Sequence, residues 1–240
     1  MTLLLLGGTG EAREIAAHLR RQDAVISLAG ATRNPQVQPL PTRVGGFGGA
    51  AGFRRYLEGA GITAVLDATH PFAARITART ALICGEMGVP FLQFLRPPWT
   101  PEPDDNWVGI ETEAEAAAYI PRGSTVFLGT GRQTLAQFAN LAGCEVICRQ
   151  IDPPQQPFPF PGGRFLVGRP PFSVEDEEAL FRDLGVDYLV VKNAGGAPSR
   201  TKLTAARNLR IPVLMLARPP QGDWPVVDTI EDALEWVRSP

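Results

Sequence analysis

The chain has 240 residues, 44% of them hydrophobic, which is enough apolar material for one large core or two smaller ones. Its net charge of −2 excludes a general attraction to nucleic acid or to an anionic membrane, and no apolar run approaches the roughly twenty residues of a membrane-spanning helix. Three cysteines lack zinc spacing, and the first residues lack the features of a signal peptide. We therefore expect a cytoplasmic protein with reduced thiols and no metal.

The first twenty residues predict a strand, a glycine turn and a helix. Leu3–Leu6 are typical of a strand buried on both faces, Gly7–Gly10 follow at once, and apolar residues then recur at helical spacing. This order opens a nucleotide-binding βαβ unit, although Arg13 replaces the last fingerprint glycine and an ordinary strand–helix turn also uses glycine. The residues assigned here to cofactor binding are Gly8, Thr9, Gly10, Glu11 and Ala12.

The end of the second predicted strand, Ala24–Leu28, indicates which dinucleotide binds. No acidic residue lies between Asp23 and Glu58, whereas Arg33 follows the strand closely. In such units an acidic residue at this place selects NAD, and an arginine accommodates the 2′-phosphate of NADP. Arg33 therefore favours NADPH, with a solvent-exposed loop arginine as the alternative.

A glycine-rich loop, Gly45–Gly49, precedes a helix predicted over 50–59. Four glycines around one aromatic residue are costly in backbone entropy, and a ligand lying against the loop would explain them. We assign Gly46, Phe47 and Gly48 to the cofactor site.

The strand predicted over Ala64–Asp67 runs into Thr69 and His70. The carboxyl end of a strand is where ligands collect in open parallel sheets, so both residues are assigned to the cofactor site. His70 is also the candidate catalytic residue, as a proton donor. A structural hydrogen bond is the alternative role.

A proline-rich stretch at 96–105 interrupts the alternation of strands and helices. It predicts an α/β chain of two domains, residues 1–96 and 97–240. Further strands are predicted over 108–110, 125–128, 145–148, 164–167, 187–191 and 212–216. Helices are predicted after 110, after 132, over about 174–184, from about 202 to 209 and over 230–237.

Three strand ends of the second half carry glycine beside a basic residue: Gly129–Arg132, Gly168-Arg169 and Lys192–Gly196. If the strands are parallel, these turns share one edge and form a cationic cleft for a substrate with several carboxylates or phosphates. Ordinary turns with solvated cations are the alternative reading of each.

Tyr188 and Lys192 have the spacing of a short-chain dehydrogenase pair. The apolar residues between them predict a strand, in which the two side chains would stand roughly 13 Å apart and could not form one proton relay. The sequence also lacks a phosphate loop ending in Gly-Lys-Ser/Thr and a Gly-x-Ser-x-Gly elbow, which argues against triphosphate hydrolysis and esterase chemistry.

Nearly the whole chain resembles the precorrin-6A reductase family of cobalamin biosynthesis. The segments that carry the resemblance are Gly7–Arg13, Gly45–Gly49, Asp67–Ala73 and Lys192–Gly196. Gly10 departs mildly from the family, which often has serine there.

The resemblance implies NADPH-dependent reduction of precorrin-6A to precorrin-6B, with hydride added to one ring carbon and a proton to its neighbour. It implies two Rossmann-like domains with the site between them and a strand exchanged between the sheets, for which Pro212–Leu216 is our candidate. The first domain would hold NADPH and the second the tetrapyrrole. The residues assigned to the substrate are Arg132, Lys192, Asn193, Gly196 and Lys202.

Two other functions stay open at this point. One is an NADP-dependent reductase for a different anionic substrate, and the other is a non-catalytic NADP-sensing protein. In either case we expect a monomer or a weak homo-oligomer.

Overall fold

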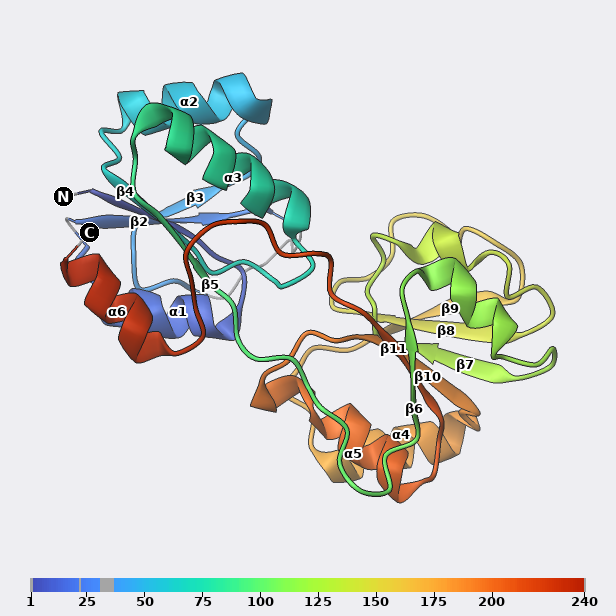
Figure 1. Ribbon diagram of the computed structural model, residues 1–240. Helices are drawn as coiled ribbons and strands as arrows, with labels where there is room; N and C mark the ends of the chain where they lie inside the picture. Colours follow the sequence, from blue (N-terminus) through green and yellow to red (C-terminus); the bar gives the residue numbers. More distant parts are fainter. Residues whose placement is uncertain (1, 22, 31–36, 240) are drawn as a thin grey trace. The chain divides into compact units, whose positions relative to one another are not determined.

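A computed structural model describes residues 2–21, 23–30 and 37–239. The chain divides into two compact units, one formed by Met1–Pro97 with Pro219–Pro240 and the other by Pro98–Arg218. Each unit is built on its own six-stranded sheet (Figure 1). The expected α/β fold with two parallel sheets is confirmed.

The sheet of the first unit has the order β12-β5-β4-β1-β2-β3, and neighbouring strands are parallel. Its strands are β1 (Leu3–Leu6), β2 (Ala24–Leu28), β3 (Thr42–Val44), β4 (Ala64–Asp67), β5 (Phe91–Phe94) and β12 (Val226–Val227). Its helices are α1 (Gly10–Ala17), α2 (Gly49–Gly59), α3 (Ala74–Met87) and α6 (Ile230–Arg238).

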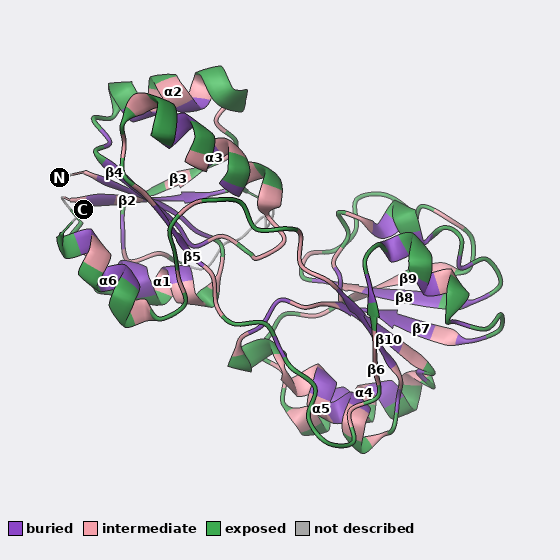
Figure 2. Ribbon diagram, in the orientation of Figure 1, coloured by how far each residue is buried: buried purple, intermediate pink, exposed green. Residues whose placement is uncertain are grey.

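The four leucines of β1 divide between two cores, one on each face of this sheet. Leu3 and Leu5 pack in the cluster that includes Ile15 of α1 and Val237 of α6. Leu4 and Leu6 pack in the other cluster, with Phe53 and Leu57 of α2. Successive side chains of a strand point to opposite faces, so an uninterrupted apolar run requires helices on both sides (Figures 1 and 2).

The expectation that the second domain extends to residue 240 is wrong for its last part. β12 pairs with β5, and Ala233, Leu234 and Val237 of α6 lie in the core of the first unit. The physical reason is that α6 has an apolar face, and this face is removed from water when it packs against the apolar face of α1 in the first unit. Residues 219–240 thus return to the first unit.

The proposed candidate for strand exchange is wrong as well. β11 (Val213–Leu216) lies inside the second sheet, between β6 and β10, and all four of its residues are buried. A strand that is covered on both faces belongs at the centre of a sheet. The strand that returns to the first unit's sheet after the second unit is β12, a two-residue edge strand. Neither β12 nor β3 was predicted from the sequence.

The sheet of the second unit has the order β6-β11-β10-β7-β8-β9, again parallel throughout. Its remaining strands are β6 (Trp107–Ile110), β7 (Thr125–Leu128), β8 (Glu145–Gln150), β9 (Gly163–Val167) and β10 (Tyr188–Lys192). Its helices are α4 (Val174–Leu184) and α5 (Thr201–Asn208), with the 3₁₀ turns η1 (Glu113–Ala118), η2 (Leu135–Phe138) and η3 (Ala197–Ser199).

Two helices predicted for the second unit are only short 3₁₀ turns, η1 and η2. Pro121 and Gly123 follow the first segment, and Gly131 and Gly143 flank the second, so each segment is bounded by residues that end helices. Both still bury apolar residues, Ala116 in η1 and Phe138 in η2. Tyr188 and Lys192 lie on a strand, as predicted, and are not a helical pair.

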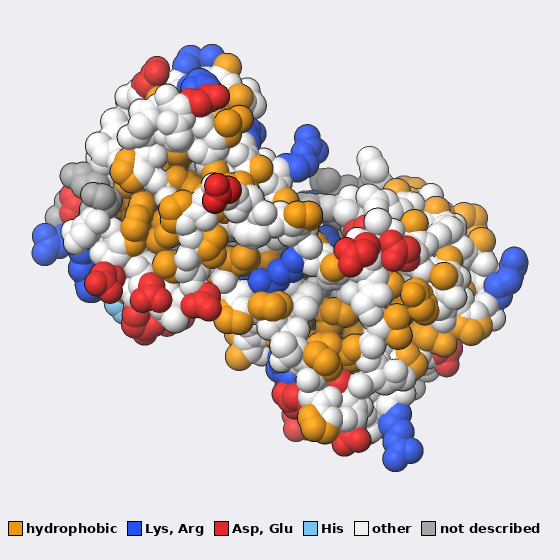
Figure 3. Space-filling view, viewed as in Figure 1, with side chains coloured by type: hydrophobic (Ala, Val, Ile, Leu, Met, Phe, Trp, Pro, Cys, Tyr) orange, Lys and Arg blue, Asp and Glu red, His pale blue; other side chains and the backbone are white. Residues whose placement is uncertain are grey.

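On the face drawn in Figure 3, basic side chains are scattered, and several acidic side chains lie close together at the lower left. Within the described ranges, no helix combines the length and apolar character needed to cross a bilayer.

Candidate functional site

The turn between β1 and α1 places open backbone at the carboxyl edge of the first sheet. Gly8 has a φ of +121°, which a residue with a side chain rarely adopts, and an added Cβ at Gly8 or Gly10 would meet no atom within 4 Å. Gly7 differs, because its Cβ would lie 2.7 Å from Ile26. Gly7 is therefore favoured by packing, whereas the space beside Gly8 and Gly10 is open.

Thr9 fastens this turn to the neighbouring strand. Its Oγ1 accepts the N–H of Ala12 at 3.1 Å and donates to the carbonyl of Ala68 at 2.8 Å. Glu11 forms an ion pair with Arg96, which follows β5, at 3.0 Å. The Ala12 side chain is fully buried in the core. Of these predicted residues, Thr9 and Glu11 thus fix the position of the turn through a hydrogen bond and an ion pair, and Gly8 and Gly10 lie beside open space.

The glycine loop Gly45–Gly49 is braced by Arg43, a residue that the sequence analysis did not assign. The guanidinium donates to the carbonyl of Gly46 at 2.6 Å and to that of Gly45, and it lies 3.8 Å from the centre of the Phe47 ring. Phe47 also packs edge-on against Phe53 of α2. An arginine two residues before a glycine run was the available signal.

Gly46 lacks any internal reason to be glycine. Gly45, Gly48 and Gly49 have positive φ values of 111°, 76° and 83°, but Gly46 does not, and a Cβ added to Gly46 meets nothing within 4 Å. The backbone of Gly46 therefore lies beside open space.

The segment after β4 is held by a buried carboxyl group. Asp67 is fully buried, and its Oδ1 accepts the N–H of Thr69 at 2.9 Å. Burial raises the pKa of Asp67, although hydrogen bonds from Thr77 and Thr69 act in the opposite direction. His70 is exposed, and its Nδ1 accepts the N–H of Phe72 at 3.2 Å. The structural hydrogen bond considered for His70 is thus present.

Arg33, the predicted 2′-phosphate ligand, lies outside the described residues.

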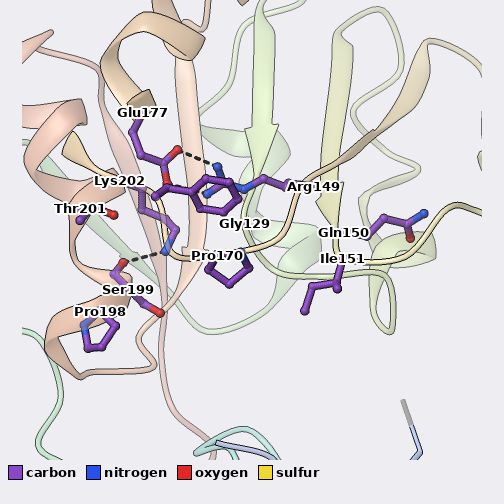
Figure 4. Close-up of a pocket in the computed structure, with 12 residues that line it drawn as sticks. Gly129, Arg149, Gln150, Ile151, Pro170, Glu177, Pro198, Ser199, Thr201 and Lys202 are labelled. Atoms are coloured by element: carbon purple, nitrogen blue, oxygen red, sulfur yellow. Dashed lines mark hydrogen bonds and ion pairs between the residues drawn. The ribbon is translucent and has the colours of Figure 1, made fainter. Parts of the chain in front are cut away.

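The carboxyl edge of the second sheet contains a cavity of about 170 Å³ (Figure 4). It collects the residues that follow β7, β8 and β9 together with the start of α5. The lining includes Gly129, Arg149, Gly168, Glu177, Ser199 and Lys202. The three glycine turns predicted to share an edge do so, because β7, β8, β9 and β10 are parallel.

Arg149 and Glu177 form a buried ion pair in this cavity, and neither residue was predicted from the sequence. Nη1 and Nη2 of Arg149 donate to Oε2 and Oε1 of Glu177, each at 2.7 Å, and the two side chains are 9% and 1% exposed. Arg149 also lies 4.3 Å from the centre of the Phe172 ring. Arg149 directly follows the strand predicted over 145–148, which was the available signal, and nothing local pointed to Glu177 on α4.

Of the five residues predicted to bind substrate, only Lys202 lines this cavity. Lys192 ends β10, and burial lowers its pKa while the carboxylate of Glu113 acts in the opposite direction. Arg132 is exposed in the turn after β7. All three cations belong to the same sheet edge.

Asn193 and Gly196 have structural partners. The Asn193 side chain accepts the backbone N–H of Trp99 at 2.8 Å and donates to the Trp99 carbonyl at 3.0 Å. The Gly196 carbonyl accepts the Trp99 indole N–H at 2.9 Å, and Arg218 donates to the carbonyls of Asn193 and Ala194. The Asn193–Gly196 loop therefore holds the chain where it enters the second unit and where it leaves it.

Two open parallel sheets with helices, the first begun by a strand, a glycine turn and a capped helix, define a protein of two Rossmann-like domains. The family model described as "Precorrin-6x reductase CbiJ/CobK" matches residues 2–238. The chain therefore belongs to the precorrin-6x reductase family, as its sequence motifs indicated. As a member it is an oxidoreductase of cobalamin biosynthesis that acts on a CH–CH bond.

Similar proteins span nearly the same length. The precorrin-6A reductase of Rhodobacter capsulatus is 42% identical over 238 residues, covering 98% of this chain and 95% of that protein. The precorrin-6A reductase of Rhodococcus erythropolis is 44% identical over 242 residues, covering 98% and 96%. A solved structure, "CobK precorrin-6A reductase", has a TM-score of 0.94 at 42% identity and covers 99% of this chain and 96% of that one.

Proposed function

We propose that this protein reduces precorrin-6A to precorrin-6B with NADPH. The observation that carries the proposal is the near full-length likeness, at 42–44% identity, to relatives named precorrin-6A reductase. The architecture of the two sheet edges supports a division of labour, in which the first unit binds the dinucleotide and the second binds the tetrapyrrole.

The first unit fits a dinucleotide. Gly8, Gly10 and Gly46 leave the backbone accessible, and the N-terminus of α1, with its partial positive charge, suits a pyrophosphate. We assign the region of Gly8–Ala12 to the pyrophosphate, and the Gly46–Gly48 loop with Thr69 and His70 to the reactive end. Arg33 is proposed for the 2′-phosphate. When bound, the reduced nicotinamide supplies the hydride.

The second unit fits a polyanionic ring. Arg132, Lys192 and Lys202 supply cations at one sheet edge, and the amide N–H groups of the strand–helix turns add donors for carboxylates. The Asn193 side chain holds the backbone of Trp99, so we propose that Asn193 and Gly196 contribute to substrate binding by fixing the position of their loop.

The test is to follow NADPH absorbance in purified protein with and without precorrin-6A, and to identify the product by mass spectrometry. We expect NADPH consumption only when precorrin-6A is present, and a product two mass units heavier. NADH serves as the matched cofactor control and should support a slower rate, because it lacks the 2′-phosphate.

Two outcomes would replace the proposal. Consumption of NADPH with another polyanionic acceptor, and none with precorrin-6A, would identify a different reductase. Binding of NADP without turnover of any acceptor would identify a sensing protein.

A further inference from the structure

The amino group of Lys202 projects into the cavity of the second unit (Figure 4). Lys202 is the second residue of α5, and its Nζ donates to the carbonyl of Ser199 at 2.7 Å. An ammonium has three N–H donors, so two more can serve another group in the cavity. The Nζ lies 5.9 Å from the centre of the Trp99 ring.

The lysine stem occupies a space that Gly129 leaves open. A Cβ at residue 129 would lie 3.6 Å from Cδ of Lys202 and 3.1 Å from Val191 of β10. A larger residue at 129 would therefore crowd the stem between β7 and β10. The position of Lys202 is thus supported by the turn η3, which precedes its helix, and by the sheet.

Two charged groups from neighbouring elements face Lys202, Arg149 of β8 and Glu177 of α4. They neutralise each other through their two-pronged ion pair. Burial and the guanidinium of Arg149 lower the pKa of Lys202 to about 8, although the carboxylate of Glu177 opposes the change. An amine of this kind is protonated at neutral pH and releases its proton far more readily than an exposed lysine does.

We propose, on the basis of the proposed function, that Lys202 is the catalytic residue that delivers the proton to the macrocycle carbon beside the hydride acceptor. This assignment replaces His70, which is exposed and uses Nδ1 for the Phe72 N–H. The Arg149–Glu177 pair is a positioning element that sets the charge around the amine.

The step balances. One double bond of the macrocycle is consumed, and two C–H bonds form on adjacent carbons. One hydrogen arrives as the hydride supplied by NADPH, which is oxidised. The other arrives as a proton when an N–H bond of the Lys202 ammonium breaks, which leaves a neutral amine that solvent protonates again.

The first test needs no turnover. The chain has two lysines, Lys192 and Lys202, so protein labelled with ¹³C at the lysine ε carbon gives two signals in an NMR pH titration. Lys202→Arg removes one signal and thereby assigns it. We expect that signal to titrate with a midpoint near 8, well below the ordinary lysine value of 10.5. Titration at the ordinary value would overturn the proposal.

The second test separates proton transfer from charge. Lys202→Gln removes charge and proton, whereas Lys202→Arg keeps the charge on a group that does not release its proton near neutral pH. We expect both to lower kcat by roughly 10²- to 10⁴-fold, the usual range for a general acid. Lys202→Arg should leave the Kd for precorrin-6A within a few-fold, and the wild-type kcat should fall above about pH 8.

The control is Arg182→Gln, which removes a cation from the exposed face of α4. It should keep the wild-type kcat and pH profile. If Lys202→Arg turns over at the wild-type rate, Lys202 serves only as a charge and the proposal fails. If the wild-type protein does not consume NADPH with precorrin-6A, the proposed function fails instead, and the NMR titration still decides the state of Lys202.

Discussion

The carboxyl edges of the two sheets present different chemistry, although both sheets have six parallel strands. In the first unit the edge is mostly accessible backbone, at Gly8, Gly10 and Gly46. In the second unit it carries charged side chains, with Arg149, Glu177 and Lys202 around one cavity. A shared scaffold thus leaves the choice of ligand to the residues that follow its strands.

The largest expected effect comes from breaking the buried ion pair at the carboxyl edge of the second sheet. Arg149→Ala leaves the buried carboxylate of Glu177 without its partner, and breaking such a pair costs about 3–5 kcal/mol. Urea unfolding should show this loss in the free energy of unfolding. Arg182→Ala, which breaks an exposed pair on the same unit, is the control and should cost only about 0.3–0.5 kcal/mol.

Replacing both partners by methionine should restore much of the stability lost in Arg149→Ala, because no unpaired charge then remains. Equal losses for Arg149→Ala and the control would show that the ion pair does not hold this edge together.

The first unit has a buried carboxyl group, Asp67, where the second has an ion pair. Burial raises its folded-state pKa above the ordinary 3.8, so above that pH the folded protein keeps a proton that the unfolded chain releases. Its contribution to stability therefore decreases as pH rises towards the folded-state pKa, by at most about 1.4 kcal/mol per pH unit.

Asp67→Asn removes this decrease. We expect urea unfolding from about pH 4 to about pH 7 to show that the free energy of unfolding of the variant increases relative to that of the wild type as pH rises. Asp183→Asn on the exposed face of α4 is the matched control, because it makes the same substitution at an exposed position. A constant difference between wild type and Asp67→Asn would mean that the carboxyl ionises normally.

A third test addresses the open backbone of the first edge. A Cβ at residue 46 meets no atom within 4 Å and Gly46 has no positive φ, so Gly46→Val should change the free energy of unfolding by less than about 0.5 kcal/mol. The Kd for NADPH, measured by calorimetry, should rise about tenfold, or about 1.4 kcal/mol. Gly59→Val, equally unhindered at the other end of α2, is the matched control and should leave the Kd unchanged.

The smallest effect concerns Arg43, which braces a loop in the first unit. Arg43→Lys keeps the charge but replaces the planar fork that holds two carbonyls. The KM for NADPH should rise about threefold, or about 0.7 kcal/mol, with little change in kcat. Arg55→Lys on the same unit should have no effect. A much larger rise that disappears at high salt would instead show that Arg43 binds the cofactor directly.

Local patterns were sufficient for much of the fold. The apolar run of β1, the glycine turn after it and the capped, amphipathic α4 are each recognisable from neighbouring residues, because strand and helix periodicity are properties of short segments. The family motifs were likewise visible as short segments, and the family model bears them out.

Long-range partners were decided only when the chain folded. The pairing of β12 with β5, the meeting of Arg149 with Glu177 and the use of the Asn193 amide to hold Trp99 all join residues far apart in the chain. Neither member of such a pair carries a local mark of the other. A free amide or carboxylate suits a ligand as well as a structural role, so the packing around each group determines which role it takes.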